Sequence, residues 1–117
     1  GINRPASLIA LTEADYDLET AVHLKGTTAV VHHAAALWAG QGRREGRAII
    51  NTTSPVGVHP MPDGGPYCAA KAGIAALTVV AAQELASLGV RANAIAPAAR
   101  GRRVRPGPTG TPLRAGA

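Results

Sequence analysis

The chain has 117 residues and a formal net charge of +5, and its aromatic residues are one Trp and two Tyr. This length fits one small domain or a part of a larger one. No signal-peptide pattern opens the sequence, and charged residues or glycines interrupt every apolar run, so we expect neither secretion nor a membrane-spanning segment. The single cysteine excludes an internal disulfide and fits a reducing, cytoplasmic setting.

The first predicted element is a long helix over residues 13–39. Thr12 and Asp15 have the spacing of an N-cap residue followed by an acid three positions later. Apolar residues then recur at helical spacing. Gly26 is expected to loosen this helix, and the Gly-Gln-Gly run at residues 40–42 ends it.

Two short strands and a second long helix follow. The β-branched run RAIINT, residues 47–52, suits a buried parallel strand. A loop rich in Pro and Gly separates it from a helix over residues 67–88, which Gly89 caps. The run VRANAIA, residues 90–96, predicts a second strand that Pro97 ends. The alternation implies a parallel sheet with helical crossovers, and because two strands leave edges and a face open, we expect partner strands from a missing N-terminal half or from another chain.

The excess positive charge lies at the C-terminal end. Up to Pro97 the basic and acidic residues balance, and the excess consists of five arginines: Arg100, Arg102, Arg103, Arg105 and Arg114. A basic tail can contact phosphate, but this composition favours a solvated, disordered end. We therefore divide the chain into a folded part, residues 1–97, and a disordered tail, residues 98–117, and expect no nucleic-acid partner.

Three residues around the Pro/Gly loop could handle protons. Tyr67 and Lys71 are four positions apart and share a face of the second helix. The Lys71 ammonium would favour the phenolate form of Tyr67, which could exchange a proton with a substrate oxygen. Ser54, at the carboxyl end of the first strand, could hydrogen-bond the same oxygen. The plainer alternative is a helix-start tyrosine, a surface lysine and a turn serine.

Metal and thiol chemistry have weaker support. We expect the adjacent His32 and His33 to point to different helix faces, and no carboxylate lies at chelating spacing with either. The sequence therefore predicts no metal site. Cys68 is interpreted as a packing residue, and the alternative, a reactive thiol, has only the nearby helix N-terminus in its favour.

From its start to about residue 103 the chain resembles the short-chain dehydrogenase/reductase family. The matching segments occur in the order GINR, LTEADYD, AVHLKGT, GRAIINTTS, YCAAKAG and VRANAIAP. The resemblance implies an α/β fold, the C-terminal portion of a doubly wound Rossmann-type domain with two parallel strands and two long helices. It also implies hydride transfer between NAD or NADP and a ketone or secondary alcohol. In these terms Tyr67 is the acid/base, Lys71 binds the nicotinamide ribose and Ser54 orients the substrate oxygen.

Other positions follow or depart from the family pattern. By the resemblance, Gly1 is the last residue of an Asn-Asn-Ala-Gly segment at the cofactor, and Pro97-Ala98 replaces the family's Pro-Gly. His23 stands where the family has an Asn that holds a water of the proton relay, as in the hydroxyacyl and multifunctional branch, and a histidine can also hold a water. The predicted catalytic residues are therefore Ser54, Tyr67, Lys71 and His23, and the predicted cofactor-binding residues are Gly1, Tyr67, Lys71, Pro97 and Ala98.

The family's Gly-rich nucleotide-binding turn is not in this sequence. Two hypotheses follow. The chain is part of an NAD(P)-dependent oxidoreductase, or it is a truncated, non-catalytic remnant or dimerisation module with no turnover of its own. In either case the resemblance implies a homo-oligomer formed through the two Ala-rich helices.

Overall fold

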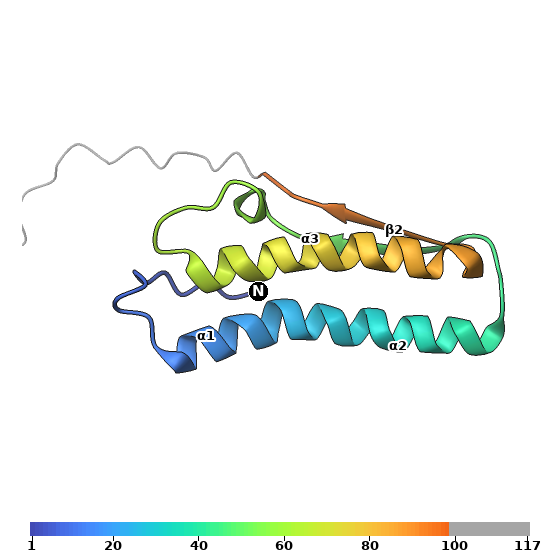
Figure 1. Cartoon of the computed structure of the whole chain (residues 1–117), viewed down its shortest axis with the longest axis horizontal. Helices are drawn as coiled ribbons and strands as arrows, with labels where there is room; N and C mark the ends of the chain where they lie inside the picture. Colours follow the sequence, from blue (N-terminus) through green and yellow to red (C-terminus); the bar gives the residue numbers. More distant parts are fainter. Residues whose placement is uncertain (99–117) are drawn as a thin grey trace, which may run out of the picture.

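The computed structural model describes residues 1–98. Apart from Ala98, the predicted disordered tail lies outside the described residues. The elements follow the predicted order of helix, strand, helix and strand (Figure 1). Strands β1 (Arg47–Thr52) and β2 (Val90–Ile95) pair in parallel, with Arg47 opposite Val90 and Thr52 opposite Ile95. The predicted α/β class and parallel pairing are therefore confirmed.

The first long helix is continuous but not uniform. It consists of α1 (Glu13–Thr20), a π-helical turn η1 (Ala21–Lys25) and α2 (Gly26–Gln41). The Thr12 hydroxyl caps it as predicted, accepting a hydrogen bond from the amide of Asp15 at 3.2 Å. The π turn was not predicted, and it lies just before Gly26, the glycine expected to loosen the helix. Such turns widen the helix locally and are frequent at functional sites.

The second long helix, α3 (Gly65–Leu85), starts two residues earlier than predicted. Pro66 occupies its first turn, where the missing N–H of a proline costs no hydrogen bond. A 3₁₀ turn, η3 (Ala86–Leu88), continues it, and Gly89 ends it with a φ of 75°. A second 3₁₀ turn, η2 (Pro55–Gly57), lies in the loop between β1 and α3.

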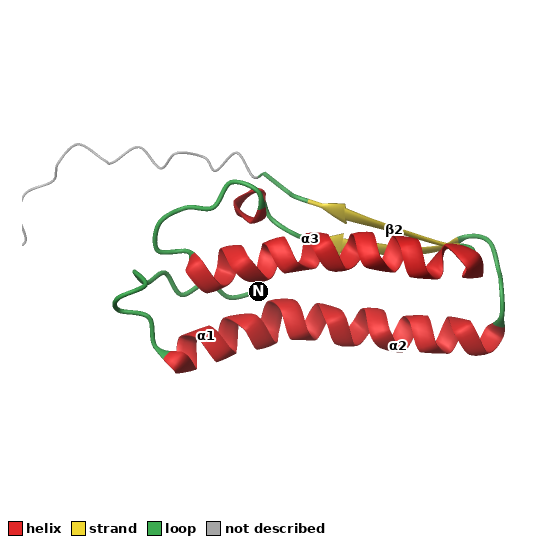
Figure 2. Cartoon of the chain, in the orientation of Figure 1, coloured by secondary structure: helices red, strands yellow, loops and turns green. Residues whose placement is uncertain are grey.

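Helix α3 packs on the strands and also along the first long helix (Figure 2). The buried core joins these layers through Val31, Ile49, Ala81, Leu85 and Val90. Ile50, which alternates with Ile49 along β1, is 67% exposed. Within residues 1–98, therefore, one face of the sheet is covered and the other is open.

By length and mean hydropathy alone, the helical stretch Gly65–Leu88 could cross a membrane. The expectation that no segment would approach such a span is wrong on these two criteria. The buried face of the stretch carries Lys71 and Thr78 and packs against the rest of the fold. This arrangement is typical of the core helix of a globular domain.

Candidate active site

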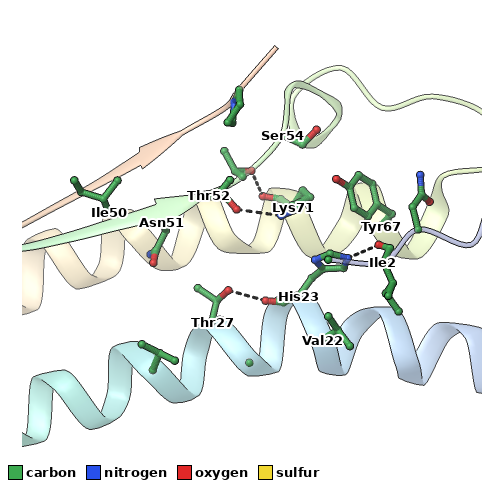
Figure 3. Close-up of a pocket in the computed structure, with 16 residues that line it drawn as sticks. Ile2, Val22, His23, Thr27, Ile50, Asn51, Thr52, Ser54, Tyr67 and Lys71 are labelled. Atoms are coloured by element: carbon green, nitrogen blue, oxygen red, sulfur yellow. Dashed lines mark hydrogen bonds between the residues drawn. The ribbon is translucent and has the colours of Figure 1, made fainter. Parts of the chain in front are cut away.

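A hollow of about 860 Å³ opens at the carboxyl end of β1 (Figure 3). The carboxyl ends of parallel strands are where open α/β sheets bind ligands. Its walls come from the N-terminal segment, η1, the start of α2, the end of β1 and the first turns of α3. Of the predicted site residues, six line it: Gly1, His23, Ser54, Tyr67, Lys71 and Pro97. Ala98 is not among the residues that line it.

Lys71 is buried, with 8% of its surface exposed. Its ammonium donates a hydrogen bond to the Thr52 carbonyl at 3.1 Å and lies 5.7 Å from the centroid of the Tyr67 ring. Burial lowers the pKa of Lys71 from its usual value, because desolvation disfavours the charged form. An ammonium carries three N–H donors, and the bond to Thr52 uses one. The alternative of a surface lysine is therefore wrong.

The loop after β1 holds the backbone of Lys71. The Thr53 hydroxyl donates a hydrogen bond to the Lys71 carbonyl at 2.5 Å. A Cβ atom placed on Gly57 would lie 2.9 Å from the carbonyl carbon of Lys71. The loop therefore packs directly on the α3 backbone at this residue. No role was predicted for Thr53 or Gly57, because their contacts form only when the loop folds back onto α3.

Ser54 leaves β1 and begins the turn η2. Its Oγ accepts a hydrogen bond from the Val56 amide at 3.4 Å. In this bond the hydroxyl is an acceptor, so its proton is left for a ligand. Figure 3 shows the Tyr67 hydroxyl turned toward the side on which Ser54 lies. Ser54 is thus a turn residue, as the plainer alternative held, and it also faces the hollow.

His23 lies beside Tyr67. The centroids of the two rings are 5.0 Å apart and their planes meet at 84°. The Nε2 atom of His23 lies 2.6 Å from the Ile2 carbonyl oxygen, and because a carbonyl only accepts, Nε2 carries the proton. A Cβ atom on Gly1 would lie 2.8 Å from Cε1 of His23, so the ring occupies the space that a side chain at Gly1 would need.

The burial of one carboxyl side chain, that of Glu19, was not predicted. Glu19 is 1% exposed, and its Oε1 accepts a hydrogen bond from the Arg4 amide. Of the carboxylates in this stretch, only Asp15 was assigned a role, as part of the helix cap. The available signal was spacing, because Glu19 precedes His23 by four positions and so shares its helix face.

The other candidates lie away from the hollow. Within residues 1–98, no group of three or more His, Cys, Asp or Glu side chains could hold a metal ion. The rings of His32 and His33 are exposed, and their centroids lie 5.1 Å apart. Cys68 is buried, and its Sγ would lie 2.8 Å from a Cβ atom on Gly64, which is the environment of a packing residue.

Comparison with known proteins places the chain in a family. The sequence profile of the short chain dehydrogenase family matches residues 1–113. Hydroxyacyl-CoA dehydrogenase ChsB1 of Mycobacterium tuberculosis is 39% identical over 105 residues, covering 86% of this chain and 33% of the relative. The (3R)-3-hydroxyacyl-CoA dehydrogenase of Rattus norvegicus is 39% identical over 97 residues, covering 83% and 37%.

Solved structures agree. A short chain dehydrogenase from Mycobacterium avium has a TM-score of 0.81 and 47% identity, covering 86% of this chain and 35% of that one. The 4-hydroxyisoleucine dehydrogenase complexed with NADH has a TM-score of 0.77 and 25% identity, covering 83% and 42%. The chain spans about a third of the length of the curated relatives it matches. Sequence, fold and comparison together show that the chain belongs to the short-chain dehydrogenase/reductase family.

Proposed function

We propose that the residues lining this hollow form the acid/base part of an NAD- or NADP-dependent oxidoreductase that interconverts a ketone and a secondary alcohol. The observation that carries the proposal is the meeting of Ser54, Tyr67 and Lys71 at one hollow beyond the end of a parallel strand. Buried Lys71 and the ordered turn at Ser54 support it, because catalytic groups need fixed positions.

The hollow fits the nicotinamide end of such a cofactor. After its bond to Thr52, the Lys71 ammonium keeps two N–H donors for ribose hydroxyls. Gly1 brings backbone without a side chain to the same wall, and Pro97 lines the hollow as well. When bound, the nicotinamide supplies or accepts the hydride. A solved relative, 4-hydroxyisoleucine dehydrogenase, is complexed with NADH.

The residues of this chain handle the proton. In ketone reduction, the Tyr67 hydroxyl donates its proton to the carbonyl oxygen while hydride is added to the carbonyl carbon. The resulting phenolate is favoured by the Lys71 ammonium nearby. Ser54 donates a hydrogen bond to the same substrate oxygen and so fixes its position. In alcohol oxidation each transfer runs in reverse.

The relatives suggest the first substrates to test. Several are named hydroxyacyl-CoA dehydrogenases, and one is a 3-oxoacyl-[acyl-carrier-protein] reductase of Thermotoga maritima. A 3-hydroxyacyl thioester has the secondary alcohol that this chemistry requires. We therefore propose this substrate class for the present chain, in a cytoplasmic setting.

The outer faces of the two long helices support self-association. Leu37 on α2 and Val79 on α3 are 60% and 58% exposed. Burial of such apolar side chains between two copies would be favourable. We propose a homo-oligomer that forms through these helices.

Replacing Tyr67 with Phe tests the proposal, because it removes only the hydroxyl. With a 3-hydroxyacyl thioester and NAD or NADP, we expect turnover to fall by about 10²–10⁴-fold, while the cofactor affinity measured by calorimetry falls much less. Tyr16→Phe, at an exposed position of α1, is the control and keeps full turnover. Unchanged turnover in Tyr67→Phe would contradict the proposal. If the full chain neither binds a nicotinamide cofactor nor turns over, the non-catalytic alternative is the better account.

A further inference from the structure

The first residues of the chain form an extended segment, Ile2–Ala6, that crosses from the hollow to the start of α3. Three hydrogen bonds to other elements hold it at alternate residues: His23 Nε2 to the Ile2 carbonyl at 2.6 Å, the Arg4 amide to Glu19 Oε1 at 2.5 Å, and the Ala6 amide to the Asp63 carbonyl at 2.9 Å. Alternate residues of an extended chain direct their backbone groups to the same edge. The segment is therefore fastened to the first long helix and to the loop before α3.

This segment connects two parts of the site. At one end, Ile2 and Asn3 line the hollow. At the other end, Ala6 forms a parallel bridge with Gly64, the residue that caps α3 three positions before Tyr67. A displacement of the segment would move the wall of the hollow and loosen the start of the helix that carries Tyr67.

Glu19 is the middle attachment, and its burial needs an explanation. A carboxylate with 1% exposure has lost its hydration, which is costly unless hydrogen bonds replace it. The Arg4 amide supplies such a bond, and hydrogen bonds to an ionised acceptor are the strong class. The Arg4 guanidinium contacts Asp15, one turn earlier on the same helix, at 3.2 Å. An apolar residue at this position would avoid the desolvation cost of the carboxylate. It could not, however, accept the hydrogen bond from the Arg4 amide.

We propose that Glu19 is a positioning residue of the site, which holds the segment Ile2–Ala6 through the Arg4 amide. Glu19 and His23 lie four positions apart, so they share one helix face. They form hydrogen bonds to the segment at two alternate residues, Arg4 and Ile2. Glu19 does not touch the reacting atoms. Its effect on turnover rests on the proposed function, whereas its hold on the segment does not.

Amide hydrogen exchange of the full chain tests this hold directly. In Glu19→Ala, which removes the acceptor, we expect the Arg4 and Ala6 amides to exchange at least about tenfold faster. The Ile74 amide, in the buried middle of α3, should keep its rate and so report that the fold is intact. Glu19→Gln keeps an acceptor oxygen and should restore most of the protection. Asp17→Ala, an exposed carboxylate on the same helix, is the matched control and should exchange like the wild type.

A second measurement reads the site itself. In Glu19→Ala the NMR signals of the His23 and Tyr67 rings should shift, whereas a role confined to helix stability would leave them unchanged. Unaltered Arg4 exchange in Glu19→Ala, or equal loss of protection in Glu19→Gln, would overturn the proposal. If the exchange results are as expected but the wild type binds no NADH in calorimetry, the proposed function fails and the hold of Glu19 on the segment stands.

Discussion

The rings of His23 and Tyr67 meet edge to face, with centroids 5.0 Å apart, while His23 Nε2 donates a hydrogen bond to the Ile2 carbonyl. Edge-to-face contact is a favourable arrangement of neighbouring rings. The π turn η1 carries His23 into this position. The orientation of Tyr67 and the position of the N-terminal segment therefore depend on the same side chain.

Two replacements of His23 should distinguish the effect of its ring contact with Tyr67 from that of its hydrogen bond to the Ile2 carbonyl. His23→Ala removes both, and we expect turnover with a 3-hydroxyacyl thioester and NAD or NADP to fall by about 10- to 100-fold, because small displacements of catalytic groups are costly. His23→Asn keeps a donor for the Ile2 carbonyl and should retain more activity. Steady-state kinetics of both variants checks this. If Asn is as poor as Ala, the ring contact with Tyr67 is the important one, and full activity in His23→Ala would contradict both roles.

Gly57 should be intolerant of a side chain. A Cβ atom there would lie 2.9 Å from the Lys71 carbonyl carbon and 3.0 Å from the Ala72 amide nitrogen, and backbone atoms in a helix cannot give way easily. We expect Gly57→Ala to lower the free energy of unfolding by about 1–3 kcal/mol, as overpacking does. Gly40→Ala is the matched control, since no atom lies within 4 Å of its Cβ, and it should stabilise α2 by about 0.5–1 kcal/mol. Urea denaturation measures the free energy of unfolding of both variants. An equal change in Gly57→Ala and Gly40→Ala would contradict the close approach of Gly57 to the α3 backbone.

The pattern of the sequence predicted the elements well, because helices and strands are encoded locally. The strand at residues 47–52 and the cap at Thr12 lie as expected. The second long helix also starts within two residues of its predicted position. The π turn was missed because it changes the hydrogen-bond pattern without a distinctive residue, and the preceding helix pattern continues through it.

The site was predictable only in part. The spacing of Tyr67 and Lys71 indicates a shared helix face, which depends on local geometry alone. The bond from Thr53 to the Lys71 carbonyl spans 18 positions, and that from Arg4 to Glu19 spans 15. Such contacts depend on how separate elements pack, so no local sequence pattern predicts them. The roles assigned to the site residues stay predictions that the kinetic variants test.

Arg47 should stabilise the end of α2. Its guanidinium donates hydrogen bonds to the Gly42 carbonyl at 2.8 Å and the Trp38 carbonyl at 3.3 Å, and lies 5.6 Å from the centroid of the Trp38 ring. Cations that bond the last carbonyls of a helix are favourable. We expect Arg47→Met to lower the free energy of unfolding by about 1–3 kcal/mol in urea denaturation. Arg91→Met, at an exposed position of the neighbouring strand, should change it little, and similar losses in both would contradict the capping role.

The burial of Lys71 should appear in the pH dependence of stability. Desolvation lowers its pKa in the folded protein below 10.5, the value expected in the unfolded chain. Between these two pKa values the unfolded state binds more protons, so this residue makes stability rise with pH across that window; below it, the full cost of the buried charge applies. Lys71→Met removes the titration. The wild-type free energy of unfolding minus that of the variant should therefore rise from neutral pH to about pH 10.5 in urea denaturation. The same difference for Lys25→Met, an exposed lysine, should stay flat, and a flat or falling difference for Lys71→Met would contradict the prediction.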